Sequence, residues 1–271
     1  AHFLIFEPFG LAGPLVVFAS FGVLVLVALK LRLPNDTPRF AARGIVTSYP
    51  SAASVNQPEV EEGIEEDNAL PREEVRLPWR DERFANWLVA GLIGGHAQAI
   101  MLGVVGFLIR DRLGLHDLPK ETVEATGSVM FVGAMATLLA QWGLIPILQI
   151  GSRASVLWGA FLALLGIILV GVSYDFYGIT LGFALASLGF GLYRPGFTTG
   201  ASLAVRRFEQ GDVAGKIASL SGSAYIVTPA IGVALFNWWE PATFILIGIA
   251  LLYLIVWGRK ALDDAPKPLD A

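Results

Sequence analysis

The chain has 271 residues, of which 55% are hydrophobic and only 15% are charged, and its formal net charge is −4. Soluble domains carry about 25% charged residues, so this composition argues against a soluble globule. The absence of cysteine excludes disulfide frameworks, iron–sulfur clusters and thiol nucleophiles, and three histidines argue against a multi-histidine metal site. With 23 acidic and 19 basic residues, a strongly basic nucleic-acid-binding protein is excluded as well. We therefore expect no metal, no cofactor and no nucleic-acid partner.

Seven long apolar runs account for most of the chain. A helix that spans the ~30 Å hydrocarbon core of a bilayer needs about 20 residues, and most of the runs meet this length. No Asp or Glu lies inside any run, and the only basic residues inside them are Arg194 and Lys216. The sequence therefore predicts an all-α, polytopic membrane protein with seven transmembrane helices. The runs are residues 10–28, 85–109, 127–150, 154–172, 177–205, 213–236 and 241–257.

A polar segment, residues 31–83, separates the first two runs. It contains seven basic and eleven acidic residues, whereas the other 218 residues contain twelve of each. The net charge of the chain is therefore the charge of this one segment. We interpret it as a solvated linker, and the alternative is an interfacial amphipathic segment before Phe84 that is anchored by Trp79.

Basic residues alternate from one connection to the next. Fifteen Lys and Arg residues lie in every second connection, and only Arg110, Arg112 and Lys120 lie in the others. Because positively charged loops stay in the cytoplasm, we expect the N-terminus outside and the C-terminus inside. The basic connections are residues 30–83, Arg153, the stretch from Arg206 to Lys216 and the stretch from Arg259 to Lys267.

Small residues and prolines punctuate two of the later runs. Small residues let membrane helices approach closely, and a proline removes one backbone hydrogen bond and bends the helix. These runs are therefore expected to pack closely and to bend. The residues concerned are Pro195 and Gly196 in the run 177–205, and Gly215, Pro229 and Gly232 in the run 213–236.

The predicted order of elements is one helix, a long polar segment and six further helices. This order resembles the second part of a twelve-helix transporter built from two six-helix halves. The chain resembles the major facilitator superfamily, and within it the drug:proton antiporters. Their motif G-x8-G-x3-G-P-x2-G-G is matched in the run 213–236 by Gly215, Pro229 and Gly232. The run departs from the motif at Ala224, Thr228 and Val233. Their cytoplasmic loop motif survives only as Gly151 and Arg153, without its acidic residue. The tract 189–202 resembles their helix ten in its glycines, proline and small residues.

The resemblance covers helices six to twelve and implies a division of the chain into four parts. Residues 1–30 correspond to the last helix of the N-terminal half, 31–83 to the cytoplasmic central linker, 84–260 to the C-terminal six-helix half and 261–271 to a cytoplasmic tail. It also implies that the preceding helices of the same chain are missing, which fits a sequence that begins with Ala1. The expected location is a bacterial inner membrane.

Arg194 is the most informative single residue, because it lies about eleven residues from the inner end of its run. An arginine near the centre of a membrane helix costs at least ~2.5 kcal/mol, so it should face a water-filled cavity or a partner. We interpret it as a contact for an anion or carboxylate in a transport path. The alternatives are a clamp on carbonyls freed by Pro195, or a side chain that reaches to the inner surface.

Other polar residues inside the runs are candidates for the same path. His96 could relay protons, because histidine titrates near neutral pH, although it could equally be a satisfied hydrogen-bonding residue. Gln98 is two residues away and cannot share a helix face with His96. Gln141 and Trp142 could add polarity and an aromatic wall.

The helix that begins near Val213 carries a further polar face. Ser221, Tyr225 and Thr228 have i, i+4, i+7 spacing, and we expect this face to look into the bundle. Aromatic residues would provide a permissive apolar cavity. They are Trp142, Phe190, Tyr193, Phe197 and Tyr225.

The function expected from these features is secondary transport, namely proton-coupled export of small amphipathic compounds. The expected partners are a small-molecule substrate, protons, the lipid bilayer and the missing helices. No carboxylate lies in the runs, so the coupling group is His96 or belongs to the preceding helices. The alternatives are a non-transporting scaffold or assembly factor with a transporter fold, a membrane enzyme and a seven-helix receptor. The enzyme is disfavoured because the only outer cluster, formed by Asp111, His116 and Asp117, flanks a short loop. The receptor is disfavoured because Lys260 lies outside the last run.

Overall fold

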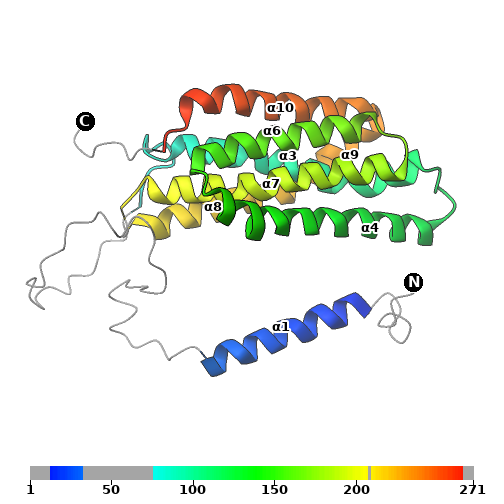
Figure 1. Cartoon of the computed structure of the whole chain (residues 1–271), viewed down its shortest axis with the longest axis horizontal. Helices are drawn as coiled ribbons and strands as arrows, with labels where there is room; N and C mark the ends of the chain where they lie inside the picture. Colours follow the sequence, from blue (N-terminus) through cyan, green and yellow to red (C-terminus); the bar gives the residue numbers. More distant parts are fainter. Residues whose placement is uncertain (1–12, 33–75, 207–208, 265–271) are drawn as a thin grey trace, which may run out of the picture. The chain divides into compact units, whose positions relative to one another are not determined.

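A computed structural model of the chain describes residues 13–32, 76–206 and 209–264 (Figure 1). Every regular element in this part of the chain is helical. The chain divides into two compact units, Ala1–Asn68 and Ala69–Ala271. Most of the expected linker and tail lie outside the described residues, which include only residues 31–32, 76–83 and 261–264 of these two segments.

The first unit contributes helix α1, Gly13–Arg32, where the sequence predicts the first transmembrane helix. It has 20 residues, and its charged residues Lys30 and Arg32 both lie in the last turn. A helix of this length is about 30 Å long, which equals the thickness of the hydrocarbon core. Basic residues at its C-terminal end also interact favourably with the helix dipole.

Six segments of the second unit are long and apolar enough to cross a membrane. Together with α1 they confirm the expected all-α, multi-pass membrane protein. In Figure 1, α10, α6, α7 and α4 follow one another across the bundle, and α3 and α9 lie behind them. The segments are α3 (Ala85–Arg112), the continuous run of α4 (Pro119–Leu138), η3 (Leu139–Leu144) and α5 (Ile145–Leu148), α6 (Ser152–Val172), α7 (Phe176–Leu203), α8 (Gln210–Ile226) with α9 (Thr228–Trp238), and α10 (Glu240–Ala261).

Helix α4 begins eight residues before the apolar run that predicted it, at Pro119 instead of residue 127. Proline suits the first turn of a helix, because its fixed φ is helical and its missing N–H would have no partner there. Glu121 in the same turn interacts favourably with the positive end of the helix dipole. Hydropathy marks the part of a helix that lies in lipid, and it therefore misses polar first turns of this kind.

Helices α6 and α7 form the most extensive helix pair of the bundle. Glycines on both helices lie against the backbone of the other. A Cβ at Gly159 would lie 2.6 Å from the nitrogen of Tyr193, and a Cβ at Gly182 would lie 2.7 Å from the nitrogen of Val170. Only glycine fits at such distances, which is the close packing that small residues allow in membranes.

At one end of the bundle, Arg112 joins three helix ends. It is the last residue of α3, and its side chain is only 4% exposed. Its Nε donates to Oε1 of Glu240 at 2.6 Å, at the start of α10. Its Nη2 donates to the carbonyl of Gly171 at 2.9 Å, and its Nη1 donates to the carbonyls of Val170 and Ser173. The guanidinium thus caps the C-terminus of α6, whose last carbonyls have no partner within the helix.

At the opposite end, residues 76–83 are bound to the connection between α7 and α8. The Nη2 of Arg83 lies 2.8 Å from Oδ2 of Asp81, and its Nη1 lies 2.9 Å from Oε2 of Glu209. The same Glu209 oxygen accepts from the N–H of Arg206 at 2.8 Å. These contacts fix the approach of the chain to α3.

Two further contacts lie at this end. Trp79, the candidate membrane anchor, is half-exposed, and its ring centre lies 5.6 Å from Nζ of Lys216. The N–H of Arg153, at the start of α6, donates to Oδ1 of Asp264, which follows α10, at 2.8 Å. The described basic connections of the second unit therefore meet at one end of the bundle. That this end faces the cytoplasm stays a prediction.

Candidate functional site

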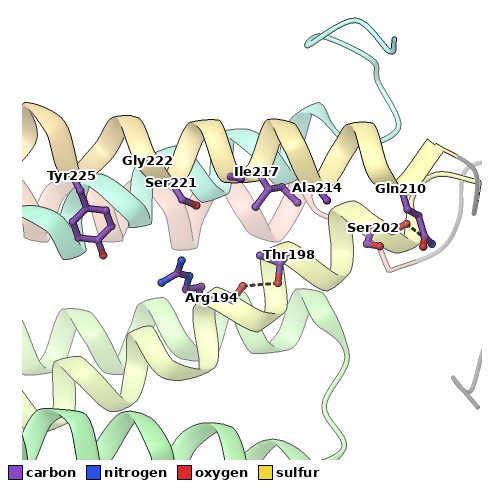
Figure 2. Close-up of a pocket in the computed structure, with 10 residues that line it drawn as sticks. Arg194, Thr198, Ser202, Gln210, Ala214, Ile217, Ser221, Gly222 and Tyr225 are labelled. Carbon is purple, nitrogen blue, oxygen red and sulfur yellow. Dashed lines mark hydrogen bonds between the residues drawn. The ribbon is translucent and has the colours of Figure 1, made fainter. Parts of the chain in front are cut away.

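A cavity of about 610 Å³ lies between α7 and α8 (Figure 2). Helix α7 continues through Pro195 to Leu203, and it carries the polar side chains of one wall at intervals of four residues. Residues four apart lie on one helix face, so this wall follows from local geometry. The residues that line the cavity are Arg194, Thr198, Ser202, Gln210, Ala214, Ile217, Ala218, Ser221, Gly222 and Tyr225.

Arg194 lies nine residues before the end of α7, or about 14 Å along the helix axis. Its exposed side chain points from α7 toward the face of α8 that carries Ser221 and Tyr225 (Figure 2). No Asp or Glu lines this cavity, and among the described residues the guanidinium forms no ion pair. The backbone beside it is held by the Thr198 hydroxyl, which donates to the carbonyls of Arg194 and Pro195 at 3.0 Å.

Lys216, the other basic residue inside the runs, does not line the cavity. Its side chain is only 9% exposed, and its ammonium forms an ion pair with Asp212 one turn earlier in α8. The same ammonium lies over the ring of Trp79. The charge of Lys216 is therefore paired with Asp212 at the end of the bundle. Among the residues that line the cavity, Arg194 is the one that carries a formal charge.

Most of the aromatic residues expected to wall a cavity lie elsewhere. Phe190, Tyr193 and Phe197 are each at most 3% exposed and belong to the core between helices. The Tyr193 hydroxyl donates to the carbonyl of Ala90 in α3, and a Cβ at Gly94 would overlap the Tyr193 ring. Tyr193 is thus placed in the α3–α7 interface, not in the cavity. The reason is that Tyr193 lies one position before Arg194 and so points to another side of the helix.

His96 lies in a second, smaller cavity of about 390 Å³, together with Thr228. Its Nδ1 is 2.7 Å from the carbonyl of Leu92, one turn earlier in α3. Gln98 is half-buried and does not line either cavity. Thr228 does not share the face of Ser221 and Tyr225, because α8 ends at Ile226 and the chain turns before α9.

Gln141 and Trp142 lie in η3, a π-helical turn within the α4 span. Pro146 cannot donate to the carbonyl of Trp142 four residues before it, which frees this turn from regular α-helical bonding. Gln141 is half-buried and the Trp142 side chain is 82% exposed, and neither lines the cavity at Arg194. Short π-helical turns occur often at functional sites, but no residue of this turn lines either of the two described cavities.

The expected packing residues differ in their surroundings. A Cβ at Gly196 would lie 2.8 Å from Cβ of Ser155 in α6, and a Cβ at Gly232 would lie 2.8 Å from Cγ2 of Ile100 in α3. Pro229 lies in the first turn of α9, directly after the break between α8 and α9. Gly215 faces open space among the described residues, so it has no packing role within this unit.

Gly151 and Arg153, the two residues that match the cytoplasmic loop motif, have an acidic neighbour from another part of the chain. A Cβ at Gly151 would lie 2.8 Å from Oδ2 of Asp264, the residue that accepts from the Arg153 N–H. The motif lacks its acidic residue in the loop itself, and Asp264 supplies a carboxylate to the start of α6. Sequence spacing could not reveal this contact, because 111 residues separate the two partners.

Three polar residues of the cavity, Thr198, Ser202 and Gln210, were not predicted as site residues. Thr198 and Ser202 follow Arg194 at i+4 and i+8, so the spacing rule for helix faces could have identified both. Gln210 has no such signal, because it begins α8 and reaches the cavity only through the packing of the two helices. Its Nε2 donates to the carbonyl of Ser202 at 3.2 Å.

Among the described residues, no group of three or more His, Asp or Glu side chains could hold a metal ion. No family model matches the chain, and no curated protein matches it. The functional argument therefore depends on the described side chains.

Proposed function

We propose that the chain is part of a secondary transporter of the major facilitator type, and that the cavity between α7 and α8 belongs to its substrate path. The observation that carries this proposal is Arg194, a charge within an apolar span that faces a cavity lined by polar groups. Charged residues in membrane helices almost always face the bundle interior or a water-filled cavity, and they mark substrate paths.

The exposed face of α8 supports a larger assembly than the six spans alone. Gly211 and Gly215 have open space where a Cβ would stand. Small residues on a membrane helix are typical of a surface that packs against another helix. We propose that the partner is a second half of the same transporter, with helices beyond those of this unit, in a bacterial inner membrane with the C-terminus in the cytoplasm.

The transport we propose is proton-coupled export of small amphipathic compounds. Carboxylates in the described spans lie near the helix ends, so His96 is the titratable group of the interior that is suited to proton transfer. A hydrogen bond from Nδ1 to the Leu92 carbonyl would leave Nε2 free to accept a proton. His96 and Arg194 lie in different cavities, which would separate the proton site from the substrate site.

The test is export by the full-length protein in a bacterial host that lacks its own exporters. Growth and compound accumulation are measured on a panel of toxic amphipathic compounds, with and without a proton uncoupler. We expect wild-type protein to lower accumulation only when the proton gradient is present, Arg194→Ala to abolish the effect, and His96→Ala to remove its pH dependence. Arg110→Gln is the matched control, because Arg110 pairs with Asp111 outside the cavity. A well-expressed wild-type protein that lowers no compound's accumulation would contradict transport and favour a scaffold.

A further inference from the structure

The cavity at Arg194 offers hydrogen-bond donors in excess of acceptors. A guanidinium carries five N–H donors and no acceptor. The hydroxyls of Ser202, Ser221 and Tyr225 also line the cavity, and none of the three forms a hydrogen bond with another described protein group. Four groups are therefore able to donate to a guest at the same site.

The positive charge of this cavity is not compensated by a nearby carboxylate. Asp212 is the acidic residue of α8, and its Oδ2 is occupied by the N–H of Leu77 at 3.0 Å and by the ammonium of Lys216. It lies in the first turn of α8, nine residues before Ser221, and does not line the cavity. A cationic guest would therefore meet only the like charge of Arg194, whereas an anionic guest would neutralise it.

Apart from Thr198 and Gln210, which form hydrogen bonds to backbone carbonyls, the remaining walls are apolar. Ala214, Ile217 and Ala218 on α8 and the ring of Tyr225 surround the donors. The volume of about 610 Å³ is within the range of sites that take small organic molecules. Resting on the function proposed above, we infer that the substrate is an amphipathic anion, whose carboxylate, sulfonate or phosphate oxygens bind the Arg194 guanidinium with the hydroxyls of Ser221 and Tyr225. Its apolar part lies along α8.

The inference is tested by binding of two fluorescent probes that differ only in their anionic group. Anilinonaphthalene sulfonate carries a sulfonate, and phenylnaphthylamine is the same ring system without it. Both are titrated onto the purified full-length protein in lipid nanodiscs. We expect Arg194→Gln to weaken binding of the sulfonate by about 10- to 100-fold, the range of a charge-assisted hydrogen bond, and to change phenylnaphthylamine binding by less than about twofold.

Two variants control for charge and for folding. Arg194→Lys keeps the charge but loses the planar fork of donors, so we expect a loss of less than about tenfold. Arg110→Gln removes an arginine outside the cavity and should leave both affinities unchanged. Equal loss of both probes in Arg194→Gln, or no loss of the sulfonate, would overturn the inference.

A measurement on the wild-type protein keeps the inference testable if Arg194→Gln fails to fold. Decanoate and decyltrimethylammonium have the same chain and opposite charges, and we expect only decanoate to displace the bound sulfonate probe. Displacement by both at similar concentrations would contradict an anion site. The export assay is separate from these titrations. Selective anion binding without export would refute transport, and export of cationic compounds without anion selectivity would refute the substrate class.

Discussion

The two basic residues inside the apolar runs illustrate how much a single residue can signal. Arg194 and Lys216 both interrupt hydrophobic sequence, yet only Arg194 faces a cavity without a carboxylate. The i, i+4 spacing of Asp212 and Lys216 predicts their ion pair from sequence alone. The absence of carboxylates from the apolar runs likewise predicts that Arg194 has no acidic partner within the spans, and no Asp or Glu lines its cavity. The uncharged groups that surround Arg194 could not be predicted in this way, because they depend on how α7 and α8 pack.

The buried Tyr193 hydroxyl gives a prediction at this scale. Because it donates to the Ala90 carbonyl between α7 and α3, we expect Tyr193→Phe to lower the free energy of unfolding by about 0.5–1.5 kcal/mol. Since Tyr193 does not line the cavity, binding of the sulfonate probe should not change. Thermal unfolding in detergent and probe titration measure the two quantities. Tyr177→Phe is the control, because Tyr177 is 82% exposed. A loss of probe binding without a loss of stability would place Tyr193 in the substrate path.

At the scale of elements, the packing of α6 on α7 depends on glycines that face backbone. A Cβ at Gly166 would lie 2.6 Å from the carbonyl oxygen of Gly182. We expect Gly166→Leu to separate the two helices and to lower the free energy of unfolding by about 1–3 kcal/mol or more. Gly127→Leu is the matched control, because Gly127 lies in the membrane-spanning part of α4 with open space around its Cβ position. Thermal unfolding should shift strongly in the first variant and little in the second, and equal shifts would contradict the proposed close packing.

The sequence predicted the elements better than their contacts. Apolar length predicted each of the six candidate spans of the second unit, because the bilayer imposes a minimum length on each helix. Pro229 predicted a bend, and the structure has a break there, since α8 ends three residues before Pro229. The consequence for Thr228 was missed, because i+7 spacing describes a face only while the helix is continuous. The position of Tyr193 was missed because the sequence does not show what an aromatic side chain faces. Tyr193 packs against Gly94 of α3 and does not face the cavity.

At the scale of the whole molecule, an arginine connects neighbouring segments at each end of the bundle, Arg112 at one end and Arg83 at the other. Hydropathy cannot distinguish these two arginines from ordinary loop charges. Arg110 and Arg112 are two residues apart, but the first pairs with its neighbour Asp111 and the second caps α6 and binds Glu240. The partners of Arg112 lie 58 or more residues away in sequence. Contacts over such separations depend on how the spans pack. The candidate site was therefore predicted at Arg194 and Tyr225, and its full lining required the fold.

The bridge that Arg83 forms with Asp81 and Glu209, at the end of the bundle opposite Arg112, predicts a pH dependence of stability. Hydrogen bonds from Arg83 lower the pKa of the Asp81 carboxyl from its ordinary value. Burial raises the pKa of Glu209, but the hydrogen bonds from Arg83 and the Arg206 N–H outweigh it and leave this pKa lowered as well. A carboxylate whose pKa is lower in the folded protein stabilises the fold above its unfolded pKa of about 4, and this stabilisation disappears as the pH falls through the folded value.

The wild-type protein should therefore lose stability as the pH is lowered from about 6 to about 3. Arg83→Gln should be less stable by about 1–2 kcal/mol at neutral pH, because the bridge is partly buried, and its stability should fall less on acidification. The two curves of melting temperature against pH should converge at the acidic end. Arg80→Gln, which removes an exposed arginine three residues earlier, should follow the wild-type curve. If Arg83→Gln also kept the full acid dependence, other carboxylates would control it, and the bridge would only connect residues 76–83 to the start of α8.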